Sequence, residues 1–297
     1  MGSTPFHGWI LEVMEAPTPV SALLHAGLLN AGPFLIIRFA FLFDILNYAP
    51  IVLFIMGALT AIYGALVFTT QSTVKTALAY SSIAHMGFTL MVCGLGVYAA
   101  SLLHLVAHSF YKAHSFLSSG SLVEKVRIKP ASQFSRKGNI GRILLGFSLA
   151  TSLFVLVASL MGISFSTEYQ LLIIGAIIFI STANLLIQAI DSSNSLRAIF
   201  KSLSAMVMVL VLFFSLERFM SFALGNQIPE LSAPSYTLTL VSGVTLTIFI
   251  CIILLQAFAP LIPKGNLIKH FGVHVRNGFY INTIFDRLIN SPLNHNA

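Results

Sequence analysis

Long apolar blocks separated by short polar breaks run through almost the whole of this sequence. Each block holds about 20 residues, the length that an α-helix needs to cross the hydrocarbon core of a bilayer. A membrane β-barrel would instead show segments of about ten residues in which apolar and polar positions alternate. The pattern therefore predicts an all-α integral membrane protein with about eight transmembrane helices, in residues 17–43, 48–70, 74–97, 99–123, 142–163, 168–190, 199–224 and 236–262.

The scarcity of charge excludes a water-soluble domain. Of the 297 residues, 57% are hydrophobic and only 8% are charged, whereas soluble domains carry about 25% charged residues. The net charge of +7 needs no nucleic-acid partner, because basic residues collect on the cytoplasmic side of membrane proteins and face anionic lipids. We expect a multi-pass protein of the cell inner (cytoplasmic) membrane, with the lipid bilayer as its main solvent.

One polar stretch, rich in basic residues, divides the chain. We expect four parts: helices with the polar motifs at 1–123, a basic cytoplasmic loop at 124–141, C-terminal transmembrane helices at 142–262, and a cytoplasmic or interfacial tail at 263–297. Most other basic residues fall on the same side as the loop, so both termini should be cytoplasmic. The basic residues in and beside the loop are Lys125, Arg127, Lys129, Arg136, Lys137 and Arg142.

Ionisable residues interrupt the apolar segment "LLHLVAHSFYKAH" at 102–114. His104, His108 and Lys112 follow one another at intervals of four, so they fall within about 80° of one helix face. Ionisable side chains are expensive inside a membrane, and they usually mark a pathway for ions or protons. Histidine exchanges protons near neutral pH, and a desolvated lysine beside it is a charge that can be switched. These residues form the centre of a predicted proton path.

Two further histidines lie within apolar spans. His25 follows Pro17 and Pro19 in the first span, and His85 follows two serines in "KTALAYSSIAHMGF". The two prolines either kink the helix beside an ion site or only start it, and the sequence leaves both open. Lys75 lies at the start of the helix that carries His85. It is either a basic residue of the site or a side chain that extends to the membrane–water interface. The predicted proton path comprises His25, His85, His104, His108 and Lys112.

The same histidines allow other interpretations. A pair spaced by four residues suits a metal ion, but no third ligand lies nearby and Lys112 would repel a cation. Haem ligation needs paired histidines on facing helices, for which His25 or His85 could serve. The histidines could also serve only as hydrogen-bonding contacts between helices. We expect no metal site and no cofactor. Enzyme motifs such as a P-loop are not recognisable, and Glu217 is interpreted as a charge at the membrane rim without a function.

Three blocks, in this order, resemble the signature of the antiporter-like membrane subunits of respiratory complex I (subunit L/5) and of Mrp antiporters. They are "PFHGWILEVMEAPTPVSALLHAG", "KTALAYSSIAHMGF" and "HLVAHSFYKAHSFLSSGSLV". The continuation "HAGLLNAGPFLIIRF" is similar to the DabB-type membrane subunit of bacterial inorganic-carbon transporters, whereas complex I subunits usually read differently after this histidine.

The resemblance implies a larger fold built from two inverted repeats. This chain would correspond to the second half of it, so we expect a truncated chain or a gene fragment. The resemblance also implies that His25, His104 and His108 are proton-path histidines and that Lys112 is the basic residue after them. Lys75 matches the basic position that opens the preceding helix.

The function implied by the resemblance is proton conduction in an energy-coupled transporter of CO2 or bicarbonate. Its partner in a hetero-oligomeric complex would be a soluble zinc-containing subunit related to carbonic anhydrases, so that the membrane chain holds no zinc itself. The alternatives are a proton-translocating subunit of an NADH-quinone oxidoreductase, an Mrp-type cation/proton antiporter, and an inactive structural remnant.

Overall fold

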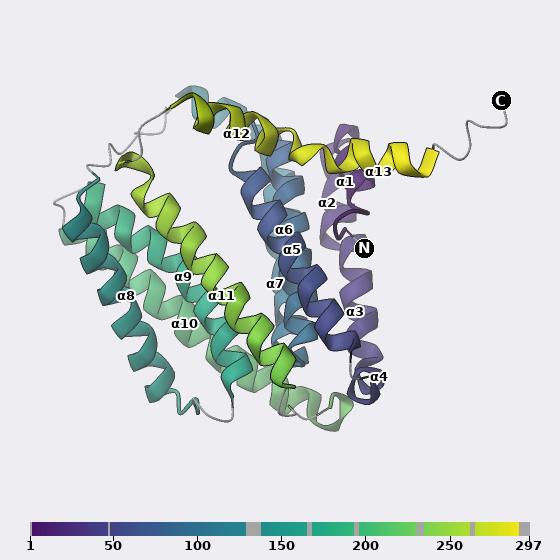
Figure 1. The fold of residues 1–297 in the computed structure, drawn as a ribbon, viewed down its shortest axis with the longest axis vertical. Coiled ribbons are helices and arrows are strands. Elements are labelled where there is room, and N and C mark those ends of the chain that lie inside the picture. The colour runs from purple at the N-terminus through teal and green to yellow at the C-terminus, as the bar shows by residue number, and fades with distance from the viewer. Residues whose placement is uncertain are drawn as a thin grey trace. The chain divides into compact units, whose positions relative to one another are not determined.

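The computed structural model describes most of the chain as helices gathered into two compact units (Figure 1). Unit 1 comprises the described residues within Met1–Gly94, Ser101–Pro130 and Lys264–Ala297, and unit 2 those within Leu95–Ala100 and Ala131–Pro263. No strand occurs among the described residues, as the apolar pattern predicts. These residues are 2–46, 48–128, 138–164, 168–192, 196–229, 231, 235–261 and 265–290.

Unit 1 combines the N-terminal motif, three long helices and the tail. Helix α7 begins in the part of the chain assigned to unit 2 and continues into unit 1. The elements are α1 (Gly8–Glu12), η1 (Val13–Glu15), α2 (Thr18–Ala26), η2 (Leu28–Asn30), α3 (Ala31–Arg38), α4 (Ala40–Ile45), α5 (Ala49–Phe68), α6 (Val74–Gly94), α7 (Tyr98–Ile128), α12 (Asn266–Arg276), η5 (Gly278–Tyr280) and α13 (Ile281–Asn290).

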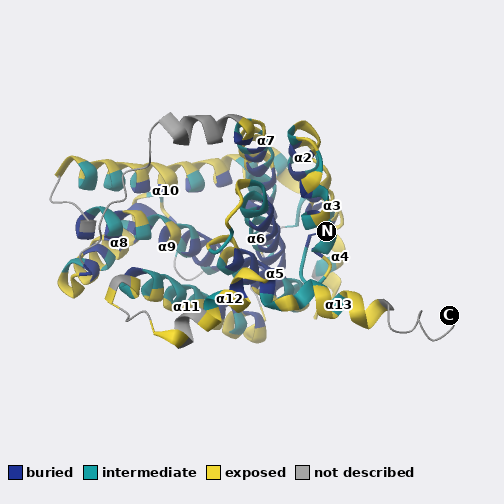
Figure 2. Cartoon of the chain, turned by 90° about the horizontal axis from the view of Figure 1, so that it is seen from above, coloured by how far each residue is buried: buried dark blue, intermediate teal, exposed yellow. Residues whose placement is uncertain are grey.

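Unit 2 is built from four long helices. Aromatic rings from three of them meet in its interior, where Phe154 lies 5.2 Å from Phe179 and 6.5 Å from Phe214, centroid to centroid. Helix α9 is the most buried of the four, whereas α10 exposes side chains along most of its length (Figure 2). The elements are α8 (Ile140–Leu160), α9 (Tyr169–Ser192), α10 (Leu196–Leu224), η3 (Gly225–Gln227), α11 (Tyr236–Phe258) and η4 (Ala259–Leu261).

Seven of the eight predicted spans are confirmed as helices long and apolar enough to cross a membrane, so the chain is a multi-pass membrane protein. The eighth, predicted at 99–123, is α7, a continuous helix of 31 residues. Because α7 contains histidines, a lysine and several serines, it is less apolar than the other seven helices and is not among the candidate spans. It also runs five residues into the predicted loop, and 129–137 lie outside the described residues. The seven spans are Thr18–Arg38, Ala49–Phe68, Val74–Gly94, Ile140–Leu160, Tyr169–Asp191, Leu196–Gln227 and Tyr236–Phe258.

The first span is broken rather than continuous. Pro17 and Pro19 start α2, so the simpler of the two interpretations of these prolines holds. The discontinuity comes later, where α2 ends at Gly27 and a 3₁₀ turn leads into α3. Pro33 follows in the first turn of α3 and has no N–H to continue the helical bonding. The chain is thus interrupted two residues after His25.

Helices α5 and α6 run side by side with their backbones in close contact (Figure 1). A Cβ atom on Gly57 would lie 2.3 Å from the amide nitrogen of Met91, and one on Gly87 would lie 2.3 Å from the amide nitrogen of Ala61. Small residues at such crossings let helices approach closely where lipid supplies no hydrophobic driving force. This contact fixes the position of α6, which carries His85.

The tail docks on unit 1 through a buried hydrogen-bond cluster. The hydroxyl group of Tyr63 donates to the carbonyl oxygen of Gly278 at 3.2 Å, and it lies 2.9 Å from Nε2 of His7. Gly278 has a φ of +60°, and a Cβ atom there would lie 2.7 Å from the Tyr63 hydroxyl oxygen, so only glycine fits. Helices α12 and α13 are each apolar on one face, and neither is a candidate span. A cytoplasmic or interfacial position for them stays a prediction.

Acid should loosen this docking through His7. Burial lowers the pKa of the His7 ring to about 4, against a smaller opposing effect of a backbone contact at Pro5. Tyr63 faces the ring, with Tyr80 behind it. The unfolded chain, with an ordinary pKa of 6.5, binds more protons between these two values. The free energy of unfolding therefore falls as the pH drops from 6.5 towards 4.

The variant His7→Gln tests this prediction, because glutamine keeps a polar partner for Tyr63 and does not titrate. We expect the Tm of the detergent-solubilised wild type to drop more, between about pH 7.5 and about pH 5, than the Tm of the variant. Equal acid sensitivity of the two proteins would contradict the assignment to His7.

Candidate functional site: a histidine and lysine path in unit 1

Three histidine rings from two neighbouring helices meet inside unit 1. His85 of α6 lies 5.2 Å from His104 and 5.6 Å from His108 of α7, centroid to centroid, and the two α7 rings are 6.1 Å apart. The spacing of four residues on α7 turns both rings to one face, and the close α5–α6 contact holds α6 opposite them. The structure thus brings together three of the five predicted path residues.

Aromatic side chains line this histidine triangle, defined as His85, His104 and His108. The ring of Phe88 lies 5.0 Å from that of His104, and Tyr111 lies 5.5 Å from His85 and 5.4 Å from His108. His108 is fully buried. Each of the three histidines therefore has an aromatic ring within 5.5 Å on at least one side, in addition to the other histidines.

Lys112 lies one turn beyond His108 and is 0% exposed. Its Nζ donates to the carbonyl oxygen of Leu78 on α6 at 3.1 Å, and the hydroxyl group of Ser82 donates to the same oxygen at 3.1 Å. The ammonium group also lies 5.6 Å from the centre of the Tyr111 ring. A buried ammonium held by a neutral carbonyl is poorly compensated, so its charged form is expensive and responds to the charge of its neighbours.

His25 joins this group from the broken first span. It is fully buried, its ring stacks on Phe116 of α7 at 4.4 Å, and it interacts electrostatically with Lys112 and His108. The break beside it is fastened to α7, because the side-chain amide of Asn30 donates to the carbonyl oxygen of Ala26 and to the hydroxyl group of Ser109, each at 2.7 Å. All five predicted path residues therefore lie along the contact of α2, α6 and α7.

The ring nitrogens in this path are buried but lack protein partners. Both nitrogens of His25 and of His108, and Nε2 of His104, have no hydrogen-bond partner among the described residues. The idea that these histidines act only as hydrogen-bonded contacts between helices predicts such bonds, and His25 and His108 do not form them. Rings at these separations can pass a proton through a bridging water molecule or by rotation of a ring.

The remaining candidates behave differently. Nζ of Lys75 donates to the carbonyl oxygens of Met14 at 3.3 Å and Ala16 at 2.8 Å, which fastens the turn before α2. A role for Lys75 in the path stays a prediction. His114, on the same helix as the triangle, is exposed. Among the described residues, no group of three or more His, Cys, Asp or Glu side chains is placed to hold a metal ion.

Sequence reasoning missed three parts of the site. Asn30 could have been suspected as a polar residue in an apolar span, and Phe116 because it lies eight residues after His108 on the same face of α7. The carbonyl oxygen of Leu78, which accepts the hydrogen bond from Lys112, could not be predicted from the sequence, because every residue has a backbone carbonyl group.

Comparisons with known proteins show which families this chain is similar to. The profile of the family described as "NADH:quinone oxidoreductase/Mrp antiporter, TM" matches residues 1–187, which include all five path residues. The "Probable inorganic carbon transporter subunit DabB2" of Halothiobacillus neapolitanus is 35% identical over 288 residues, which is 96% of this chain and 51% of that protein.

Two shorter matches concern the same families. The "Probable inorganic carbon transporter subunit DabB" of Hydrogenovibrio crunogenus is 52% identical over 120 residues, 40% of this chain and 23% of the relative. The "NADH-quinone oxidoreductase subunit L" of Rickettsia felis is 38% identical over 151 residues, 50% of this chain and 23% of the relative. The chain spans about half the length of the first of these relatives, and the aligned parts of the other two are shorter.

Proposed function

We propose, since this chain belongs to the NADH:quinone oxidoreductase/Mrp antiporter transmembrane family, that it is the proton-conducting membrane subunit of an energy-coupled inorganic-carbon transporter. The observation that carries the proposal is the path of four histidines and Lys112 at the contact of α2, α6 and α7, of which His25, His108 and Lys112 are fully buried. Ionisable groups inside a membrane are energetically costly, and they usually mark a pathway for ions or protons.

In this function the residues of unit 1 have distinct roles. The histidine triangle takes up and releases protons, while Lys112 changes its charge in response to a proton on His108. His25 carries the path to the break after α2, where the regular hydrogen bonding of the helix ends. The Asn30 amide holds that break against α7, so movement of either helix would change the distance from His25 to His108.

Inorganic carbon as the transported substrate is supported by the relatives. The match that covers 96% of this chain is to a protein named as an inorganic carbon transporter subunit. The word subunit in that name supports a second component for this chain as well, and we propose a soluble zinc-containing protein that hydrates CO2. The predicted excess of basic residues on one side supports the cytoplasmic membrane, with the basic side inward.

Isolation of the tagged full chain from its native membrane tests this proposal. We expect gentle detergent extraction to recover a soluble zinc-containing protein with it, and deletion of the gene to abolish growth at low CO2 while growth at high CO2 continues. Recovery of quinone oxidoreductase subunits instead, with loss of NADH-linked proton pumping on deletion, would favour the respiratory alternative, which the 38% identity to a subunit L supports. Absence of both partners together with an unstable product would favour an inactive remnant.

A further inference from the structure

A second polar feature lies in unit 2, apart from the residues used above. Helix α10 turns four residues to its buried face, Met206, Leu210, Phe214 and Glu217, at intervals of four, four and three. The first three belong to the apolar interior, and the fourth is a carboxylic acid that is 9% exposed. Glu217, interpreted from the sequence as a charge at the membrane rim, thus continues the buried face of α10.

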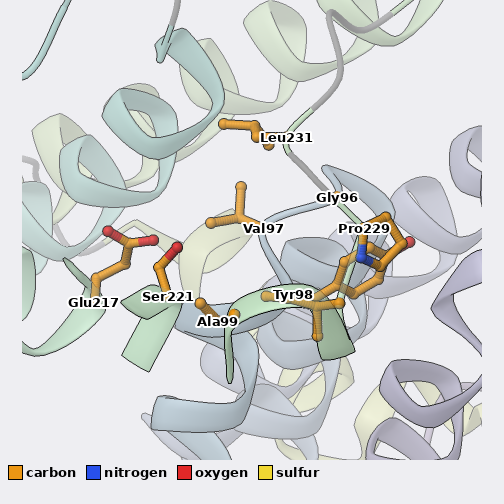
Figure 3. Close-up of a pocket in the computed structure, with 10 residues that line it drawn as sticks. Gly96, Val97, Tyr98, Ala99, Glu217, Ser221, Pro229 and Leu231 are labelled. Atoms are coloured by element: carbon orange, nitrogen blue, oxygen red, sulfur yellow. The ribbon is translucent and has the colours of Figure 1, made fainter. Parts of the chain in front are cut away.

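Glu217 lines a pocket of about 190 Å³ inside unit 2, enough for several water molecules. The backbone and side chains of residues 96–99 form one wall, and Pro229 and Leu231 form another (Figure 3). Ser221 lies one turn after Glu217 on the same helix and also lines the pocket. The pocket thus has an apolar wall and one acidic corner with a hydroxyl group.

The carboxyl group has no fixed partner within the described part of the chain. No hydrogen bond or ion pair of Glu217 occurs there, whereas its two charged neighbours are engaged elsewhere. Arg218 donates through Nη2 to the carbonyl oxygen of Gly162 at 3.2 Å, and Glu168 accepts the backbone N–H of Ser164 at 3.0 Å. An unpaired carboxylate, nine-tenths buried in a membrane helix, is costly, and this cost disappears when the group carries a proton.

We propose that Glu217 is a proton-binding site whose carboxyl group exchanges its proton with water in this pocket. A small pocket with one carboxyl group and the hydroxyl-bearing side chains of Ser221 and Tyr98 suits a proton better than a metal cation, which would require more oxygen ligands. Two charged side chains act electrostatically on this carboxyl group, Glu168 before α9 and Arg218 on α10.

The use of this site in conduction rests on the proposed function. Ala99, which lines the pocket, and His104 of the histidine triangle belong to the same helix, α7. The predicted orientation places this end of α10 on the side of the membrane away from the basic loop. Glu217 would then exchange protons with that side.

Labelling with N,N′-dicyclohexylcarbodiimide in native membranes tests proton binding without any transport assay. A protonated carboxyl group adds across a C=N bond of the reagent, so that a C–O bond forms and the proton moves to nitrogen, and an acyl shift then gives a stable N-acylurea. We expect mass spectrometry to find this adduct on Glu217, with a yield that falls as the pH rises. Asp191 is the matched control, because it is fully buried but accepts N–H groups of Gly138 and Asn139 at 3.0 Å each.

Three labelling results would overturn the proposal. Absence of the adduct at every pH at which the protein stays folded would show that the carboxyl group is not protonated in the pocket. Protection of Glu217 by Na+ but not by an equal concentration of choline would make it a sodium site instead. Labelling of Asp191 to the same extent would show that burial alone explains the reaction, which also contradicts a dedicated site.

Proton flux then tests the link to conduction. In vesicles containing the intact complex, Glu217→Gln should lower the flux about tenfold or more, and Glu217→Asp should restore part of it with a shifted pH profile. The control Glu15→Gln, the same chemical change at an exposed carboxyl group outside the pocket, should leave the flux unchanged. Unchanged flux in Glu217→Gln would remove the site from the conduction path. A wild-type complex without flux would refute the proposed function, while the labelling result would still decide whether Glu217 binds a proton.

Discussion

Replacing His108 by glutamine will stop proton conduction while the protein still assembles. His108 stands between His85 and His104 on one side and Lys112 and His25 on the other, and it is fully buried with no protein hydrogen bond to either ring nitrogen. Glutamine has a comparable length and keeps polar atoms in place, but it cannot take up a proton. Loss of a positioned proton carrier typically lowers a rate by about 100-fold or more, and no neighbouring ring spans the gap that remains.

The measurement is growth at low CO2, followed by proton flux in vesicles that contain the intact complex. His114→Gln is the matched control, because it makes the same chemical change on the same helix at an exposed position. We expect the control to behave as the wild type and both variants to reach the membrane in equal amounts. Normal flux in an assembled His108→Gln protein would refute the relay and leave these histidines as packing residues of the helix contact.

The helices and the centre of the site could be predicted because both depend on local patterns. Apolar blocks of about 20 residues mark helices in a membrane, and residues four apart on one helix share a face. These two rules are enough to place His104, His108 and Lys112 together. His25 and His85 were predicted from the sequence segments that contain them. Their positions next to α7 depend on the packing of separate helices, which local patterns do not give.

The parts that could not be predicted depend on contacts between distant segments. The break in the first span follows Gly27, and Asn30 fastens it to Ser109, a residue 79 positions away. Glu217 stands next to Arg218 in the sequence and therefore resembled a surface ion pair. Only the packing of α10 shows that the two side chains point to different surroundings, one into a pocket and the other to the carbonyl group of Gly162.

Replacing Gly87 by alanine will have the largest expected effect on stability. A Cβ atom there would lie 2.3 Å from the amide nitrogen of Ala61 and 2.8 Å from the carbonyl oxygen of Gly57, both of which are backbone atoms of α5. A side chain could turn aside, but a helix backbone cannot, so α5 and α6 must separate. We expect the free energy of unfolding to fall by about 3 kcal/mol or more, as for severe overpacking of a core.

Gly243→Ala provides the control that separates this clash from the general effect of removing a glycine. Gly243 lies within α11, and nothing lies within 4 Å of a Cβ atom placed there. In a free helix, alanine is more favourable than glycine by up to about 1 kcal/mol, so the control should be neutral or slightly stabilising. We therefore expect Gly87→Ala to lower both the Tm and the amount of folded protein in detergent. Gly243→Ala should leave both unchanged or raise them slightly. Because His85 lies two residues before Gly87 on α6, the surviving Gly87→Ala protein should also conduct protons poorly, which links the stability of the α5–α6 contact to the geometry of the histidine triangle.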